Sequence, residues 1–403
     1  MTSGVIAADR ESGVRPVARP SRPTVLHVGG AHCVSVIARE QLLALRDLGW
    51  NIEVACAPSG WESRLEEDGF RIWPIRLPHR GSAGQAVLGG ADLVRLIRGR
   101  DIALVHTHNA HHGIVGRAVA RALRVPAVHT WRYNPLDAVG RPARQTFYGL
   151  LEAAAARAGA AVLFQNAEDM RFALRARIVP PGKAKLVHNG INVARYRTAS
   201  QPQDTVRTAV GIPAEAPGPV VTCIARLDER KGHRTLLDAF ARVRHTPAPV
   251  LLCVGSGPLQ CDLETTASRL GIADRVIFTG ERTDVPDILG VSDVVVLASR
   301  REGVPRVVME AMAAGRPVVA TNVVGTRSIV QDGLNGLLVP LGDPDSLATA
   351  LATLLRDEQL RRRLALQASR DVATHWTHTA VAQRTSDIYE ILLERNRRHP
   401  GSS

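Results

Sequence analysis

The sequence predicts an α/β protein made of two doubly wound parallel sheets that face each other across a cleft. A chain of 403 residues is too long for one ordinary core and suits two domains. From Thr24, short β-branched runs alternate with stretches of helical periodicity, which is typical of a parallel sheet covered by helices. The alternation pauses in a polar, proline-containing stretch and then resumes, so the same construction is expected twice.

The first series of strands predicts an N-terminal domain over 24–195. Each expected strand contains at least one β-branched residue, and segments with helical periodicity separate the strands. The strands are expected at 24–29, 51–57, 71–77, 102–108, 126–131, 160–166 and 185–190. The preceding residues, 1–23, are rich in Pro, Arg and Ser and lack the apolar stretch of a signal peptide, so we expect a disordered leader.

The second series predicts a C-terminal domain over 219–375, after a linker region at 196–218. Its strands are expected at 220–227, 250–257, 275–280, 294–299, 317–321 and 336–340. The chain from Asp343 onward is expected to be helical. Its last segment, 376–403, has an apolar stripe that needs a surface to cover, so we expect this helix to return to the N-terminal domain before a short tail.

The charge balance limits the classes of partner. The net charge is +13, but only three of the 51 basic residues are Lys, which indicates a compositional preference for Arg. A nucleic-acid-binding protein is one alternative, yet no finger, helix-turn-helix or ribonucleoprotein motif occurs, and aromatic residues are only 4% of the chain. We therefore expect a protein that does not bind nucleic acid. No apolar run is long enough to span a membrane, so we also expect it to be cytoplasmic.

The positive charge is concentrated in the first half of the chain. Residues 1–190 hold 25 Lys and Arg against 15 Asp and Glu. An anionic partner should therefore meet this half, and peripheral contact with an anionic inner membrane surface is one interpretation. The excess includes Arg76, Arg80, Arg95, Arg98 and Arg100.

Two carboxylates, Glu302 and Glu310, stand eight residues apart around Gly303 and Pro305. Proline suits the first turn of a helix, and a helix N-terminus offers free N–H groups to an anion. The two glutamates need not face each other as hydrolytic carboxylates do. A pair of acceptor groups on either side of an anion site indicates a clamp for a ligand with hydroxyls at both ends and phosphate in the middle.

A second stretch, "ARLDERKGH", follows an expected strand and places Arg226 and Lys231 across a βα turn. Two cations at the carboxyl edge of a sheet could neutralise a diphosphate and support it as it leaves. A solvated turn is the alternative. The rarity of Lys in this chain favours the functional interpretation of Lys231.

Together, "ARLDERKGH" and "REGVPRVVMEAMAAGRPVVATNVVG" resemble the retaining nucleotide-sugar glycosyltransferases of family-4 type, with two Rossmann-like domains in the glycosyltransferase B-type fold. The resemblance implies that Glu302 contacts hydroxyls of the donor sugar and that Glu310 holds the ribose hydroxyls. It also implies that Arg226 and Lys231 bind the donor diphosphate. The amides of Gly303, Val304, Pro305, Arg306 and Val307 would complete the cradle except at Pro305, which has no N–H. Gly255 and Arg282 would line the nucleotide.

In the N-terminal domain, Gly29 and Gly30 resemble the glycine loop that approaches the donor phosphate in this family. His32 stands where many relatives carry an acidic residue, so the acceptor contact that this acidic residue makes in relatives is not assigned to this chain. His129 matches the histidine that relatives place near the reacting sugar, and a core histidine is the alternative. Arg226, Lys231, Glu302 and His129 are therefore the catalytic candidates.

Four more histidines, His106, His108, His111 and His112, fall close together and allow a zinc site. No cysteine or carboxylate completes a ligand set, and relatives with this fold act without a catalytic metal. His108 or Asn109 is expected to line the cleft instead. We thus expect no metal and no cofactor beyond the nucleotide diphosphate sugar, which is the donor substrate.

The expected activity is retaining transfer of a sugar from a nucleotide diphosphate sugar, expected to be UDP-linked, to an acceptor hydroxyl. The acceptor would be a small molecule or lipid-linked, in glycan, glycolipid or secondary-metabolite biosynthesis. A sugar-nucleotide epimerase or a glycosyl phosphorylase with the same donor site are the alternatives within this fold.

Overall fold

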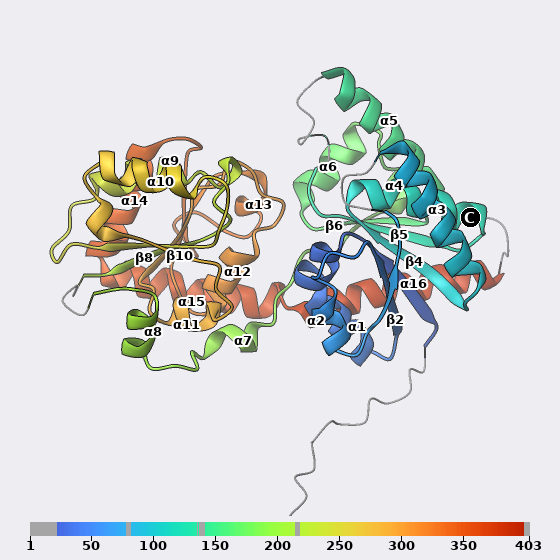
Figure 1. Cartoon of the computed structure of the whole chain (residues 1–403), viewed down its shortest axis with the longest axis horizontal. Coiled ribbons are helices and arrows are strands. Elements are labelled where there is room, and N and C mark those ends of the chain that lie inside the picture. Colours follow the sequence, from blue (N-terminus) through green and yellow to red (C-terminus); the bar gives the residue numbers. More distant parts are fainter. Residues whose placement is uncertain (1–21, 78–81, 135, 137–141, 214–217, 399–403) are drawn as a thin grey trace, which may run out of the picture.

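The computed structural model describes residues 22–77, 82–134, 136, 142–213 and 218–398. It contains a seven-stranded parallel sheet and a six-stranded parallel sheet, each with helices on both faces (Figure 1). The prediction of two doubly wound domains is thus confirmed. Most of the expected leader, and Arg80 with it, lies outside the described residues. Within these ranges, no helix has both the length and the apolar composition needed to cross a membrane.

The N-terminal sheet has the order β3-β2-β1-β4-β5-β6-β7. Residues of β1 pair with β2 on one side and β4 on the other, and His27 is opposite His106. The strands are β1 Thr24–Val28, β2 Asn51–Cys56, β3 Arg71–Pro74, β4 Ile102–His108, β5 Ala127–Trp131, β6 Ala161–Phe164 and β7 Ala184–Leu186.

Helices α3 to α6 cover one face of this sheet and α1, α2 and α16 cover the other (Figure 1). Their apolar sides fill the spaces above and below the strands, as buried parallel strands require. The helices are α1 Arg39–Asp47, α2 Ser63–Glu67, α3 Ala83–Arg98, α4 Ala110–Ala122, α5 Pro142–Ala158 and α6 Ala167–Arg175, with a short π-helix η1 Cys33–Ile37 and a 3₁₀ turn η3 Pro181–Lys183.

The C-terminal sheet has the order β10-β9-β8-β11-β12-β13. Its strands are β8 Val220–Ile224, β9 Val250–Val254, β10 Val276–Gly280, β11 Val294–Leu297, β12 Val318–Thr321 and β13 Leu337–Val339. The helices are α9 His233–Arg242, α10 Gln260–Arg269, α11 Val285–Gly290, α12 Arg306–Ala313, α13 Val324–Arg327, α14 Pro344–Arg356 and α15 Glu358–His375, with 3₁₀ turns η4 Glu229–Lys231 and η5 Ala273–Arg275.

The chain passes between the domains twice, at neighbouring points. The segment expected as a linker, 196–218, begins within one short helix, α7 Val193–Arg197, and carries a second, α8 Gln203–Ala209. The return crossing lies beside the first, because Ile191 N donates to Trp376 O at 3.0 Å and His378 N donates to Ile191 O at 3.0 Å. The two crossings therefore form one short two-stranded connection.

After the return crossing, α16 (His378–Arg398) packs against α1 on the N-terminal domain (Figure 1). Its apolar stripe is buried there with Ala382 and Tyr389 in the same core as Leu42. Polar contacts add specificity, since Trp50 Nε1 donates to Ser386 Oγ at 2.9 Å. The last helix thus completes a domain that begins more than 350 residues earlier, at Thr24.

The domains touch where the loop before α12 meets the end of β5. A Cβ built on Gly303 would lie 2.2 Å from the carbonyl oxygen of Arg132, and Asn166 Nδ2 donates to Gly303 O at 3.2 Å. Nearby, Arg306 Nη1 donates to Val36 O at 2.9 Å. Only glycine allows the two backbones to approach this closely.

Replacing Gly303 with Ala should separate the two domains locally, because the new methyl group cannot fit against the Arg132 carbonyl. We expect faster hydrogen exchange in peptides that carry Arg132 and Asn166, with an unchanged circular dichroism spectrum. Gly182→Ala is the matched control, since a Cβ at Gly182 would have no atom within 4 Å. Unchanged exchange in Gly303→Ala would contradict the close contact.

Tyr389→Phe should lower the free energy of unfolding. The buried Tyr389 hydroxyl bonds to His106 Nδ1 and lies 3.5 Å from His27 Nε2, so its loss leaves buried ring nitrogens without a partner. We expect a loss of about 1–3 kcal/mol in urea denaturation. Tyr148→Phe on α5, where the ring is 42% exposed, should change stability by less than about 0.5 kcal/mol. Equal stability of the two variants would remove this role of the hydroxyl.

Candidate active site

The clearest pairing among the predicted site residues joins Glu302 and Lys231. Lys231 ends the 3₁₀ turn after β8, and Glu302 lies in the loop between β11 and α12. These strands are neighbours in the sheet, so both residues lie at its carboxyl edge. Lys231 Nζ donates to Glu302 Oε1 at 2.6 Å. A glycine in the left-handed conformation, Gly232, follows Lys231 and passes close to the Ala298 carbonyl.

Glu310 lies in the second turn of α12 and is 9% exposed. Its Oε1 accepts from Tyr196 Oη at 2.9 Å, and Arg306 lies 3.4 Å from the same oxygen. Burial and the nearby Glu310 raise the pKa of Tyr196, so the phenol remains a donor. Glu310 Oε2 has no hydrogen bond within the described part of the chain. The second carboxylate is thus held by one oxygen and can accept a ligand on the other.

Arg226 is not fixed against Glu302. Its side chain is 66% exposed, and its Nε lies 3.6 Å from Asp228 Oδ2. The residue follows β8, as predicted, so it lies on the same edge of the sheet as Lys231. An exposed cation at the edge of the sheet is open to a phosphate group, whereas Lys231 is already held by Glu302.

The loops after β9 and β10 carry Gly255 and Arg282. Gly255 has φ +135°, and its N donates to Gly280 O at 2.8 Å. Arg282 forms two hydrogen bonds to Asp284, at 2.9 and 2.6 Å. Both residues therefore lie on the strand edge that carries Lys231, but in this structure the Arg282 guanidinium is already occupied by a carboxylate.

The loop from Gly303 to Val307 begins a helix, as the sequence indicates, with one change. Pro305 is the N-cap residue and Arg306 is the first helical residue, so the proline stands one position before the first turn. The Val304 side chain is buried in the domain core. Hence only the backbone of this valine could face a ligand.

In the N-terminal domain, Gly29 and Gly30 follow β1. Gly30 N donates to Asn109 Oδ1 at 3.2 Å, and Asn109 has φ +67° at the start of α4. His32 packs edge-on against Trp61, with ring centroids 4.9 Å apart. The glycine loop is therefore tied to the end of β4, and Asn109 lies at the strand edge.

The expectation that His129 lies beside the reacting sugar does not agree with its position. The side chain is 3% exposed, its Nδ1 lies 2.9 Å from Thr107 Oγ1, and a Cβ on Gly113 would touch its ring. Its Nε2 lies 3.9 Å from Glu152 in a buried ion pair with Arg117. His129 thus points toward α4 and α5, into the domain core, and burial lowers its pKa well below the usual value.

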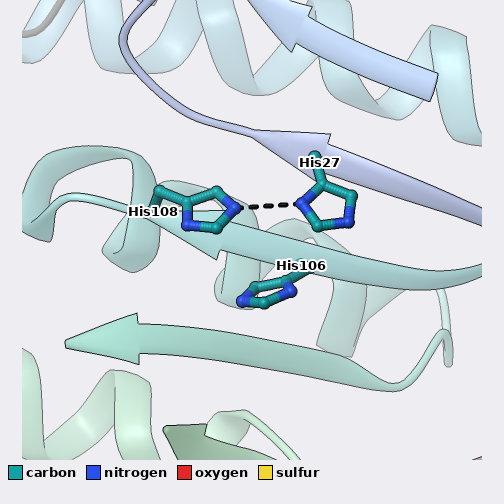
Figure 2. A group of neighbouring side chains, drawn as sticks. All are labelled: His27, His106 and His108. Atoms are coloured by element: carbon teal, nitrogen blue, oxygen red, sulfur yellow. Dashed lines mark hydrogen bonds between the residues drawn. The ribbon is translucent and has the colours of Figure 1, made fainter. Parts of the chain in front are cut away.

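A different set of histidines comes together. His27, His106 and His108 are fully buried, and their nearest ring nitrogens lie within 4.8 Å of one another (Figure 2). His27 was not among the histidines considered for zinc, and His111 and His112 belong to α4 instead. Each ring nitrogen of the trio already lies within 3.5 Å of another polar group, so a metal ion would have to displace hydrogen bonds.

Sequence reasoning missed three residues at this site. Tyr196 holds Glu310, Asn166 bonds to Gly303, and Arg132 lies under the Gly303 loop. Tyr196 comes from the stretch expected as linker, and Arg132 follows an expected strand in "HTWRYNP". An aromatic residue within a polar linker and a charged residue directly after a buried strand were the available signals.

A separate groove lies elsewhere in the described part of the chain. A groove of about 850 Å³ runs between the edge strand β3 and α3, with Trp73, Ile75 and Leu96 in its lining. This groove lies at the outer edge of the N-terminal sheet, where β3 is the edge strand. The Gly303 loop instead contacts the end of β5, which lies on the other side of β1 and β4 in the same sheet. Its rim arginines are paired, since Arg76 and Arg95 contact Asp92.

Known protein families match both domains. The family described as "Glycosyl transferases group 1" matches residues 218–357, and the "Glycosyl transferase 4-like domain" matches residues 33–190. The two matches correspond to the two sheets of the structure. One match includes Lys231, Glu302 and Glu310, and the other includes the end of β5 that faces Gly303.

Individual relatives agree with the family matches. The chain is 29% identical over 333 residues to the Escherichia coli "UDP-Gal:alpha-D-GlcNAc-diphosphoundecaprenol alpha-1,3-galactosyltransferase", covering 81% of this chain and 86% of that protein. It is 27% identical to the Bacillus subtilis "Putative glycosyltransferase EpsD", covering 87% and 91%.

Among solved structures, Anabaena Alr3699/HepE in complex with UDP and glucose has the same fold, with a TM-score of 0.78 and 24% identity over 92% of this chain and 100% of that one. The shared two-sheet architecture, the family matches and the relatives agree on one assignment. The chain belongs to the group 1 glycosyl transferases and is a glycosyltransferase.

Proposed function

We propose that this glycosyltransferase moves a sugar from a nucleotide diphosphate sugar, with UDP as the first nucleotide to test, to an acceptor hydroxyl with retention of configuration. The observation that carries the proposal is the Lys231–Glu302 pair beside the start of α12. A cation, a carboxylate and free backbone N–H groups at one strand edge suit a diphosphate joined to a sugar. The Escherichia coli relative is named for UDP-galactose, and the Anabaena neighbour holds UDP.

Each site residue has a part in this scheme. Lys231 and Arg226 bind the diphosphate, and the N–H groups of the Gly303–Val307 loop add hydrogen bonds. Glu302 accepts hydrogen bonds from hydroxyls of the donor sugar. Glu310, held by Tyr196 on Oε1, accepts from the ribose hydroxyls on Oε2. Gly255 and Arg282 lie along the nucleotide.

The proposed reaction takes place on one face of the sugar. The bond from the anomeric carbon to the diphosphate oxygen breaks, and the acceptor oxygen forms its new bond on the same face. The acceptor proton passes to the leaving diphosphate, whose developing charge Lys231 and Arg226 stabilise. The scheme needs no protein base, which agrees with the burial of the His129 side chain between Thr107 and Glu152.

The acceptor is a small molecule or a lipid-linked glycan in this proposal. We do not extend it to an anionic membrane surface, because several of the arginines that suggested one are paired. Arg76 and Arg95 contact Asp92, and Arg100 Nη2 lies 2.9 Å from Glu53. Their charge is therefore partly compensated within the domain.

Lys231→Ala should lower product formation by about a hundredfold or more while the fold is kept, because a cation is lost where negative charge develops. Product is measured with UDP-sugars and a panel of hydroxyl acceptors, and its anomeric configuration is read by NMR. Lys185→Ala is the control, since Lys185 is exposed on β7. A sugar phosphate or an epimerised donor as product, or wild-type turnover in Lys231→Ala, would contradict the proposal.

Activity should survive exhaustive treatment with EDTA. The cations and the helix N-terminus take the part of a metal ion at the diphosphate, and the buried histidine nitrogens already have hydrogen-bond partners. The measurement compares turnover before and after dialysis against chelator. Loss of activity that zinc or magnesium restores would make a metal-bound diphosphate the better description.

A further inference from the structure

Arg132 is a buried cation without a counter-ion. The residue follows β5, is 8% exposed, and has no carboxylate oxygen within 4 Å in the described ranges of the chain. Its Nη2 lies 3.1 Å from His108 Nδ1. With the Gln165 amide oxygen turned toward the guanidinium, that oxygen accepts from Arg132 Nη1 at 3.0 Å. Arg132 Nε is buried without a hydrogen-bond partner.

Two other arginines among the described residues, with side chains 0% and 20% exposed, are neutralised. Arg117 is fully buried, and its Nη2 lies 2.6 Å from Glu152 Oε1. Arg306 lies 3.4 Å from Glu310. Burial of a guanidinium without a carboxylate is strongly unfavourable, since buried charges are normally paired. Arg132 therefore differs from these arginines in having no carboxylate partner.

The groups that hold Arg132 are neutral. A guanidinium only donates, so His108 Nδ1 must accept and His108 Nε2 must carry the proton. His108 Nε2 then donates to His27 Nδ1 at 3.0 Å (Figure 2). His27 Nε2 faces the Tyr389 hydroxyl at 3.5 Å. Burial, and then the charge of Arg132, lower the pKa of His27 to about 3.

The same chain continues through Tyr389 without meeting a carboxylate. The Tyr389 hydroxyl, which accepts from His27, donates to His106 Nδ1, and His106 Nε2 donates to Thr130 Oγ1 at 2.7 Å. All three imidazoles are thus neutral, with the proton on Nε2. This network fixes the direction of the Arg132 guanidinium but supplies no negative charge.

The place of Arg132 indicates where the missing charge comes from. Its carbonyl lies against Gly303, in the loop that the proposed function assigns to the donor diphosphate. Two of its five N–H groups are used by His108 and Gln165, which leaves the remainder for a ligand. The hollow beside it is lined also by Asn109, His129 and Tyr133 and measures only about 10 Å³, so it must widen before a phosphate can enter.

We propose that Arg132 is an anion-binding residue on the N-terminal side of the cleft, and that it takes a phosphate or carboxylate group of a substrate. The identity of that substrate rests on the proposed function. The binding of an anion by Arg132 is inferred independently, from the burial and contacts of its guanidinium. Two sources share this chemistry: the donor diphosphate and an anionic group on the acceptor.

The test is calorimetry on the full chain with inorganic phosphate and UDP as probes. Arg132→Gln should weaken binding of at least one probe by about tenfold or more, because the charge-assisted hydrogen bonds of the guanidinium to the anion are lost. Arg121→Gln, an exposed change on α4, should bind both as wild type does. Arg132→Lys keeps the positive charge but loses the bidentate geometry of the guanidinium, so its affinity should lie between those of wild type and Arg132→Gln. This variant also tests the proposal if Arg132→Gln folds poorly.

The two sources separate in the presence of nucleotide. A donor phosphate predicts weaker UDP binding in Arg132→Gln. An acceptor anion predicts unchanged UDP binding, with loss of phosphate binding to the UDP-saturated protein. In phosphate-free buffer, Arg132→Gln should melt at the same or a higher temperature than wild type, because an unpaired charge has been removed.

Wild-type affinity of Arg132→Gln for both probes would overturn the inference, as would a lower melting temperature with unchanged affinities, which indicates a purely structural residue. Phosphate binding that depends on Arg132 in a protein that does not bind UDP would support the inference and contradict the proposed donor. Failure of the wild-type protein to bind either probe would contradict both.

Discussion

The contact of Gly303 with the Arg132 carbonyl constrains the whole arrangement. Because Gly303 has no side chain, the loop before α12 can run directly over the end of β5. The first helical residue, Arg306, then donates a hydrogen bond to the Val36 carbonyl, which follows β1 in the chain. The same loop brings Glu302 to Lys231 within the C-terminal sheet. One close backbone approach thus positions residues of both domains around a single point, where the strand ends of the two sheets meet.

Much of this fold follows from local pattern. Two series of β-branched runs predict two parallel sheets, and the apolar stripe after residue 376 needs a surface, which the α1 face of the N-terminal domain provides. The spacing of Glu302 and Glu310 around a proline also predicts a helix start between them, and α12 begins at Arg306. These features depend on neighbours in sequence, so the sequence is sufficient to predict them.

The rest depends on register and on which face of a strand a residue occupies. His106 and His108 share a face because side chains alternate along a strand, but His27 joins them only through the pairing of β1 with β4. Thr130 bonds to His106 on that face, so the adjacent His129 must point to the other side, toward α4. A family resemblance aligns positions without fixing such directions. Tyr196 similarly reaches Glu310 from a segment whose composition indicates only a linker.

The buried histidines explain how a charge can be held firmly without being neutralised. A carboxylate beside Arg132 would stabilise the guanidinium but also compete with any anionic ligand. Neutral imidazoles, fixed in one tautomer by the permanent donor at Arg132, orient the cation and leave its charge available. The network passes through Tyr389 of α16, the helix that crosses back from the C-terminal domain. Because that helix follows the return crossing at Trp376, the element that joins the domains also supports the cation at their contact, so the orientation of Arg132 and the placement of the two domains share one structural support.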